Sequence, residues 1–387
     1  MTSTAIRHPG ELRWETRLLA VITATLVVFG IASSYGAASL LTDRAGVNIG
    51  MSFALKQLSG ALAGGILLLI ASRMDYHHWR RMAWPLLGFT VLALLVPLLP
   101  FTHRIAPSIH GARRWIDVGP VNFQPSELAR LAVVVWAATL AAKKGDQLRD
   151  FRRGVMPFVV VIGIVSLLIL LEPNLSMATL VAFIAGVVLF TAGAKIGHFL
   201  LLGGVGTVLV WHKIVDTQYR AARLLTFLNR DDASSQASFQ ITQSLVGMGS
   251  GRIFGVGFGA GQQKLGYLPF GYSDFLFSVI GEEWGFIGVC VVVFLFALFV
   301  WLGFRIARTA PDAFGQYLAA GITSAVGITA FLHMAVTLGL MPTTGLTLPF
   351  MSYGRSSLII TLLGTGILLS IGRQRGKVPT TAKSARR

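Results

Sequence analysis

The sequence predicts an all-α, polytopic integral membrane protein, and two features of its composition lead to that fold class. Of its 387 residues, 54% are hydrophobic and only 13% are charged, and the mean hydropathy is +0.68. A soluble domain carries about 25% charged residues, so this chain has roughly half the usual supply of surface charge. Its apolar residues also come in blocks of bilayer-spanning length, about 20 residues each. This composition excludes a disordered chain, a soluble coiled coil and an ordinary cytosolic enzyme.

The apolar blocks predict about ten transmembrane helices, with nine or eleven as alternatives. We place them near 18–40, 54–71, 83–100, 126–142, 155–171, 175–192, 197–212, 275–304, 314–340 and 349–371. Pro173, between two polar residues, divides the fifth helix from the sixth. The first run is too long for a cleavable signal peptide and lacks a convincing cleavage site, so it is the first helix. The 43 glycines suit closely packed membrane helices.

The net charge of +17 is explained by membrane orientation rather than by nucleic-acid binding. With the N-terminus inside, the inner segments hold 20 of the 33 Lys and Arg residues and the short outer segments hold 5. Both termini are therefore predicted to be cytoplasmic. Two sizeable loops, 101–125 and 213–274, then lie outside, the second directly before the eighth helix.

The chain divides into one membrane domain, residues 1–372, and a basic, disordered cytoplasmic tail, residues 373–387, held near anionic lipid. A loop as long as 213–274 is usually functional. It contains an amphipathic stretch, 218–228, whose Arg220 and Arg223 share one helical face. The single cysteine, Cys290, rules out an intrachain disulfide and a cysteine metal cluster.

Residues 249–261 are rich in glycine, with the density of a dinucleotide-binding fingerprint. That fingerprint requires a preceding strand and a βαβ unit, which this chain does not offer. We therefore expect a bend or a re-entrant segment beside the bilayer, where glycine gives the backbone freedom. Binding of a phosphate by the exposed amides is the alternative.

Gln124-Pro125-Ser126-Glu127 opens the fourth predicted helix, and Arg130 follows three residues after Glu127. Proline in the first turn with an acid beside it is an ordinary helix start. Glu127 and Arg130 can pair on one face, as a structural ion pair. Charges at membrane depth are costly and usually line a cavity, so a functional role is equally open.

Asp274 stands where the long outer loop meets the eighth helix. It could cap that helix, a role worth about 1 kcal/mol that Asn or Ser could also fill. It could instead be a carboxylate base at the outer membrane surface. Glu282 and Glu283, deeper in the same helix, are interpreted as buried structural acids, at least one of which needs a basic or polar partner.

Several motifs follow one another between Tyr35 and Ile371. They are Gly111-Ala112-Arg113-Arg114-Trp115-Ile116, Gln124-Pro125-Ser126-Glu127, Leu268-Pro269, Asp274-Phe275, Gly281-Glu282-Glu283-Trp284-Gly285, Pro342-Thr343-Thr344-Gly345 and Leu348-Pro349-Phe350-Met351-Ser352-Tyr353-Gly354. Together they resemble the SEDS family of cell-wall polymerases, which includes FtsW, RodA and SpoVE. Tyr219-Arg220 and Gln262-Gln263-Lys264 look more like its FtsW branch.

Several positions depart from the family pattern. Glu172-Pro173-Asn174-Leu175-Ser176 stands where the family usually has Gln-Pro-Asp-Leu-Gly. Arg130 replaces a lysine and keeps its charge, His333 replaces an asparagine, and Arg355 replaces a glycine. None of these changes touches Asp274.

The resemblance implies a peptidoglycan glycosyltransferase that polymerises lipid II on the outer face of a bacterial plasma membrane, in cell division or shape maintenance. It implies an inverting displacement, with Asp274 as the base and undecaprenyl pyrophosphate as the leaving group. The predicted substrate-binding residues are Glu127, Arg130, Arg113, Arg114, Arg220, Arg223, Lys264 and Ser352. Arg355 is a further outer cation.

The resemblance also implies partners: lipid II, the undecaprenyl-pyrophosphate-linked glycan, membrane lipids and a class B penicillin-binding protein that acts as a transpeptidase. Nucleic acid is not among them. No ligand cluster demands a metal, although a divalent cation (Mg²⁺ or Mn²⁺) could help to neutralise the pyrophosphate. A lipid II flippase and a non-catalytic division scaffold are the alternative functions; a flippase needs polar groups along a path through both leaflets.

Overall fold

The computed structural model describes residues 13–39, 50–108, 111–119, 121–228 and 236–374. Most of this part is helical, and its only strands are two of three residues each, which confirms the predicted fold class. The predicted tail lies outside the described residues except for Arg373, which ends the last helix, and Gln374.

The ten predicted transmembrane helices are all present. They are α1 (Arg13–Ala38), α2 (Gly50–Arg73), α3 (His77–Leu95), α4 (Pro125–Lys144), α5 (Met156–Leu171), α6 (Leu175–Thr191), α7 (Ile196–Val215), α10 (Leu276–Arg308), α11 (Ala313–Thr337) and α12 (Arg355–Arg373). Within the described ranges, nine are long and apolar enough to cross a bilayer, and α6 is slightly shorter. The division at Pro173 is confirmed, since α5 ends before it and Asn174 caps α6 through the Met177 amide.

One pair of predicted boundaries is wrong. We expected helices over 314–340 and 349–371, but α11 ends at Thr337 and α12 begins only at Arg355. The intervening segment is apolar, yet it contains Pro342, Gly345 and Pro349. Proline removes an amide donor and glycine at positive φ leaves the helical region, so hydropathy alone misassigned it.

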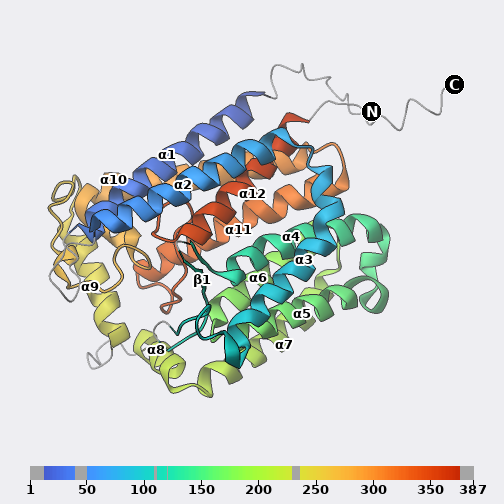
Figure 1. The fold of residues 1–387 in the computed structure, drawn as a ribbon, viewed down its shortest axis with the longest axis horizontal. Helices are drawn as coiled ribbons and strands as arrows, with labels where there is room; N and C mark the ends of the chain where they lie inside the picture. The colour runs from blue at the N-terminus through green and yellow to red at the C-terminus, as the bar shows by residue number, and fades with distance from the viewer. Residues whose placement is uncertain (1–12, 40–49, 109–110, 120, 229–235, 375–387) are drawn as a thin grey trace.

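Figure 1 shows two groups of helices side by side: α1, α2, α10, α11 and α12 form one group, and α3 to α7 form the other. Helix α11 packs on α4 and α6 between them. The described chain ends near its start, since a Cβ at Gly372 would lie 2.5 Å from Thr16. An even number of spans places both ends on the same side of the membrane.

The opposite end of the bundle carries the two long loops. One contains the antiparallel strands β1 (Ile116–Val118) and β2 (Val121–Phe123). The other contains α8 (Gln218–Leu228), which is the predicted amphipathic stretch, and α9 (Gln236–Ser250). Figure 1 shows α9 and the loop after it beside the start of α10.

Helix α10 is interrupted at Gly285, whose φ of 66° is not helical. The glycine-rich loop completes the broken hydrogen-bond pattern. The amides of Val256 and Gly257 donate to the carbonyls of Glu282 and Glu283, at 3.0 and 3.1 Å. The amides of Phe286 and Ile287 in turn donate to loop carbonyls, those of Arg252 and Ile253, at 2.9 and 3.2 Å.

This pairing settles the interpretation of the glycine-rich segment. It is a re-entrant loop packed on α10, and several of its amides are used by helix carbonyls rather than left to cradle a phosphate. Glu282 also has the polar partner that we expected, because its Oε1 accepts the Gln262 amide at 2.7 Å. Glu283 is buried as predicted.

Two glycines make this contact sterically possible. Gly255 has a φ of 82°, and a Cβ there would lie 2.1 Å from the Glu283 carbonyl oxygen. A Cβ at Gly285 would lie 2.3 Å from the Gly255 nitrogen. No side chain fits on either side of the contact.

Gly255→Ala should therefore destabilise the protein by more than about 2 kcal/mol, through backbone strain and overpacking. The measurement is thermal unfolding of the purified protein in detergent. Gly203→Ala in α7 is the matched control, because an added Cβ there meets nothing within 4 Å. It should leave Tm unchanged or slightly raised. Equal effects of the two substitutions would contradict the role of the loop in completing α10.

Candidate functional site

Asp274 lies just before α10 but does not cap it. The N-cap position is Phe275, and no side chain makes the capping hydrogen bond. The Asp274 amide donates to the Phe270 carbonyl at 3.0 Å, and the residue as a whole is half-buried. The capping interpretation is therefore wrong, and the carboxylate is left for another role.

The segment between α11 and α12 lies against Asp274. A Cβ at Gly345, whose φ is 70°, would lie 3.7 Å from Asp274 Oδ2. The Ser352 hydroxyl donates to the Ser273 carbonyl at 2.6 Å and accepts from the Leu348 amide at 2.9 Å. These contacts fix this segment to the residue next to Asp274.

Three more side chains, each from a different helix or helix terminus, hold the carbonyls of the same segment. The contacts are Arg223 Nη1 to Thr343 at 3.0 Å, Ser176 Oγ to Thr344 at 2.9 Å and His333 Nδ1 to Leu346 at 2.8 Å. Because a carbonyl only accepts, Nδ1 of His333 must carry its proton. The segment is thus held from α8, α6 and α11 at once.

Burial raises the pKa of Asp274. A hydrogen bond with Ser273 and the positive charges of Arg223 and Arg114 act in the opposite direction without cancelling the shift. Of the outer cations named from the sequence, Arg114 and Arg223 are thus the two whose charge acts on the Asp274 carboxylate.

Arg114 is held by the turn between α5 and α6. Its Nε donates to the Glu172 carbonyl at 2.9 Å and its Nη2 donates to the Pro173 carbonyl at 2.6 Å. The Glu172 carboxyl is fully buried, and neither of its oxygens has a hydrogen-bond partner among the described residues. Burial raises the pKa of Glu172 to about 8, although the charge of Arg114 opposes the rise.

The other predicted cations lie elsewhere. Arg113 donates to the carbonyls of Ala106 and Leu99 and to the Thr102 hydroxyl, so it organises its own loop. Arg220 donates to the Lys213 carbonyl at the end of α7. Lys264 donates to the Gly259 carbonyl and acts electrostatically on Glu283. Substrate binding by these three residues, and by Ser352, stays a prediction.

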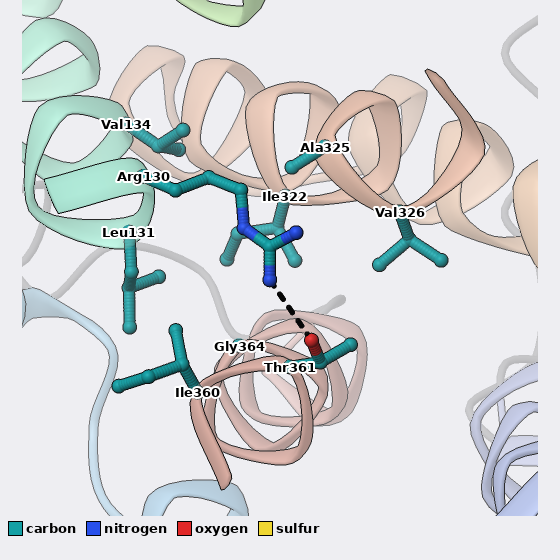
Figure 2. A pocket seen from close by; sticks show the side chains of 9 residues that line it. All are labelled: Arg130, Leu131, Val134, Ile322, Ala325, Val326, Ile360, Thr361 and Gly364. Atoms are coloured by element: carbon teal, nitrogen blue, oxygen red, sulfur yellow. Dashed lines mark hydrogen bonds between the residues drawn. The ribbon is translucent and has the colours of Figure 1, made fainter. Parts of the chain in front are cut away.

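Glu127 and Arg130 form a buried ion pair at the start of α4, with Arg130 Nη2 at 3.1 Å from Glu127 Oε2. The same nitrogen donates to Thr361 on α12 at 3.0 Å, and Nη1 lies 3.5 Å from the Thr329 hydroxyl on α11. Arg130 therefore links three helices, as Figure 2 shows for α4 and α12.

Arg130 also borders a small cavity of about 20 Å³, large enough for a water molecule. Figure 2 shows its guanidinium pointing between α11 and α12 toward Thr361. The remaining lining residues are apolar or lack a side chain: Leu131, Val134, Ile322, Ala325, Val326, Ile360 and Gly364.

The sequence did not reveal the role of Ser176, Ser273 or Thr361, because single hydroxyl residues carry no pattern. Glu172 and His333 were visible only as departures from a family motif. In the described ranges, no group of three or more His, Cys, Asp or Glu side chains is arranged to hold a metal ion. Cys290 is exposed on α10.

Comparison with known proteins gives full-length matches. A family model for the cell cycle proteins FtsW, RodA and SpoVE matches residues 16–377. A protein of Trichlorobacter lovleyi named "Probable peptidoglycan glycosyltransferase FtsW" is 39% identical over 381 residues, 98% of this chain and 99% of that protein. The stage V sporulation protein E of Bacillus subtilis is 36% identical over 356 residues, 92% of this chain and 96% of that protein.

Solved structures agree with these matches. The rod shape determining protein RodA of Thermus thermophilus has a TM-score of 0.67 and 27% identity, covering 93% of this chain and 97% of RodA. A chain from a peptidoglycan synthase complex that coordinates polymerization and crosslinking has a TM-score of 0.75 and 29% identity, covering 93% of this chain and 98% of that chain. The chain therefore belongs to the cell cycle protein family of FtsW, RodA and SpoVE.

Proposed function

We propose that this protein is a peptidoglycan glycosyltransferase that polymerises lipid II on the outer face of a bacterial plasma membrane. The observation that carries the proposal is the environment of Asp274. The residue is half-buried, its carboxylate caps no helix, and Arg114 and Arg223 are cations in electrostatic range. The name of the T. lovleyi relative supports the same activity.

In the proposed reaction, the 4-hydroxyl of the GlcNAc of one lipid II attacks the anomeric carbon of the growing lipid-linked glycan. The new C–O bond forms as undecaprenyl pyrophosphate leaves, so an α-linked donor gives a β1→4 product with inversion. Asp274 accepts the hydroxyl proton. A general base works best when its pKa lies near the operating pH, and burial moves the pKa of Asp274 in that direction.

The leaving pyrophosphate needs positive charge, and Arg114 and Arg223 are placed to supply it. Both guanidiniums are anchored on carbonyls, at Pro173 and Thr343, which orients them before substrate binds. A Mg²⁺ or Mn²⁺ ion brought in with the pyrophosphate could share this task. Arg130 is too deeply buried in the helix bundle to act at the same point without rearrangement.

A lipid II flippase is the main alternative. It would need polar groups along a path between the two leaflets. The cavity at Arg130 is lined mainly by apolar side chains, whereas Asp274, Arg114 and Arg223 gather at the outer end of the bundle. This distribution favours chemistry at the outer surface. A non-catalytic scaffold would leave these charges dispensable.

We further propose that the protein works with a class B penicillin-binding protein, in septal or lateral wall synthesis. The support is the similarity to a chain of a peptidoglycan synthase complex that coordinates polymerization and crosslinking. Polymerisation of purified lipid II, with and without the cognate transpeptidase, tests both proposals together.

Asp274→Asn should abolish polymerisation, with a loss of at least about 100-fold, because the amide cannot accept a proton. The assay is the formation of glycan strands from lipid II by the purified variant. Folding should be unchanged, since Asp274 makes no capping bond. Asp216→Asn, an exposed acid after α7, is the control and should keep full activity. Polymer yield from Asp274→Asn equal to wild type would sink the catalytic assignment.

Glu127 and Arg130 should behave as a coupled pair. Removing either partner alone leaves an uncompensated buried charge, at a cost of about 3–5 kcal/mol. Glu127→Gln, Arg130→Met and the double variant form a cycle, read as thermal stability and polymerisation. The double variant should lose clearly less than the sum of the single losses. Additive losses would mean that the two residues serve separate tasks.

Glu172 should make the stability of the protein depend on pH. Because its folded pKa is about 8 and its ordinary value is 4.5, the folded state favours the protonated carboxyl. The stability of the wild type is then highest at low pH and falls as the pH rises from 4.5 through 8. Glu172→Gln removes this loss, which has an upper bound of about 5 kcal/mol.

The measurement compares Tm of the two proteins at pH 5 and at pH 9. The Gln variant should gain on the wild type at pH 9 and match it at pH 5. Glu15→Gln is not a suitable control, because Glu15 pairs with Arg305. Asp146→Asn serves instead, because Asp146 is an exposed acid in the short helix after α4, and it should leave the pH profile unchanged. A constant difference between Glu172→Gln and wild type across the range would refute a buried, titrating carboxyl.

A further inference from the structure

The tip of the re-entrant loop, residues 252–258, presents an unusually apolar surface. Phe254 is 79% exposed, Ile253 58%, Phe258 52% and Val256 43%. Four large hydrophobic side chains within six residues would be unfavourable in water. What surrounds them depends on the depth of the tip relative to the bilayer.

The inner boundary of the hydrocarbon is marked by two tryptophans, Trp14 on α1 and Trp301 on α10. Their rings lie 6.3 Å apart, with the Arg305 guanidinium 5.2 and 5.3 Å from the ring centres. Tryptophan and arginine are typical of the membrane–water interface. This end of the bundle is also the one where the positive-inside rule places the cytoplasm.

The depth of the tip can be measured from this inner boundary along both α10 and α1. On α10, Phe286 is 15 residues from Trp301, which is about 22 Å at the helical rise. On α1, Phe29 is also 15 residues from Trp14, and its ring meets Trp284 edge to face at 5.2 Å. The hydrocarbon is about 30 Å thick, so residues 284–287 lie roughly 8 Å inside its outer boundary.

The tip is fixed at this level by backbone hydrogen bonds. The carbonyls of Arg252 and Ile253 accept from the amides of Phe286 and Ile287. Ile253 and Phe254 therefore lie within the outer half of the hydrocarbon rather than above it. Arg252 is exposed, and its guanidinium makes no hydrogen bond or ion pair with any described residue. Its long side chain can extend outward to the phosphate layer.

We propose that residues 252–258 form a phospholipid-binding tip. Acyl chains of the outer leaflet pack on Ile253, Phe254 and Phe258, and a lipid phosphate binds the Arg252 guanidinium. This inference is independent of the proposed catalytic activity. The chain returns from the tip through Gln262 and Gln263, whose amides donate to the Glu282 carboxylate on α10.

Site-directed spin labelling tests the depth. Because Cys290 is the only cysteine, Cys290→Ser gives a clean background, and Phe254→Cys then carries a nitroxide in phosphatidylglycerol liposomes. Leu265→Cys, 60% exposed on the returning chain, and Phe294→Cys, 63% exposed in mid-α10, are the aqueous and lipid references. The label at 254 should be accessible to oxygen and shielded from a water-soluble nickel complex, as at 294.

A label at 254 as open to the nickel complex as the label at 265 would overturn the proposal. Shielding from both reagents would also overturn it, since another protein surface would then cover the tip.

The phosphate contact has its own test. Added phosphatidylglycerol should raise Tm in detergent more than uncharged diacylglycerol does, and Arg252→Gln should remove most of that difference. Arg104→Gln, an exposed outer arginine, should retain it. An unchanged difference in Arg252→Gln would refute phosphate binding at Arg252.

Discussion

Backbone hydrogen bonding away from water is the constraint on which the outer half of this structure depends. An amide or carbonyl at membrane depth must find a partner within the protein. The break at Gly285 would orphan two carbonyls and two amides, and the re-entrant loop supplies all four partners. The segment after α11 is held in a similar way, by side chains that reach its carbonyls from three other elements. Asp274 lies between these two irregular segments, so its position follows from how both are satisfied.

Hydrogen bonding to backbone carbonyls also distinguishes the arginines of the outer loops from one another. Arginines occupied by nearby carbonyls of their own loop, such as Arg113, stabilise that loop. Arg114 and Arg223 instead bind carbonyls on distant elements, and their charge reaches the Asp274 carboxylate. A carbonyl is a neutral acceptor, so these two hydrogen bonds orient the guanidiniums without themselves cancelling the positive charge. Arg130 differs because Glu127 neutralises it inside the bundle.

Two departures from the family pattern preserve the local contact. Asn174 caps α6 through its side-chain oxygen, as an aspartate would. His333 donates to the Leu346 carbonyl, and an asparagine side chain also carries an N–H donor for such a bond. Glu172 is different, because it introduces a buried titratable group where an uncharged amide is usual. Glu172 should therefore make the stability of this protein depend on pH.

Hydropathy and charge in the sequence determined the ten helices and the loop carrying α8, because desolvation of each span acts locally. The motifs also singled out Asp274. They could not decide between a cap and a base, since that depends on whether Phe275 or Asp274 occupies the N-cap position of α10. Nor could the motifs show that Arg114 and Arg223 are the outer cations whose charge acts on Asp274. Those distinctions come from hydrogen bonds between residues far apart in the chain, such as Arg223 with Thr343, and only the tertiary structure brings such groups together.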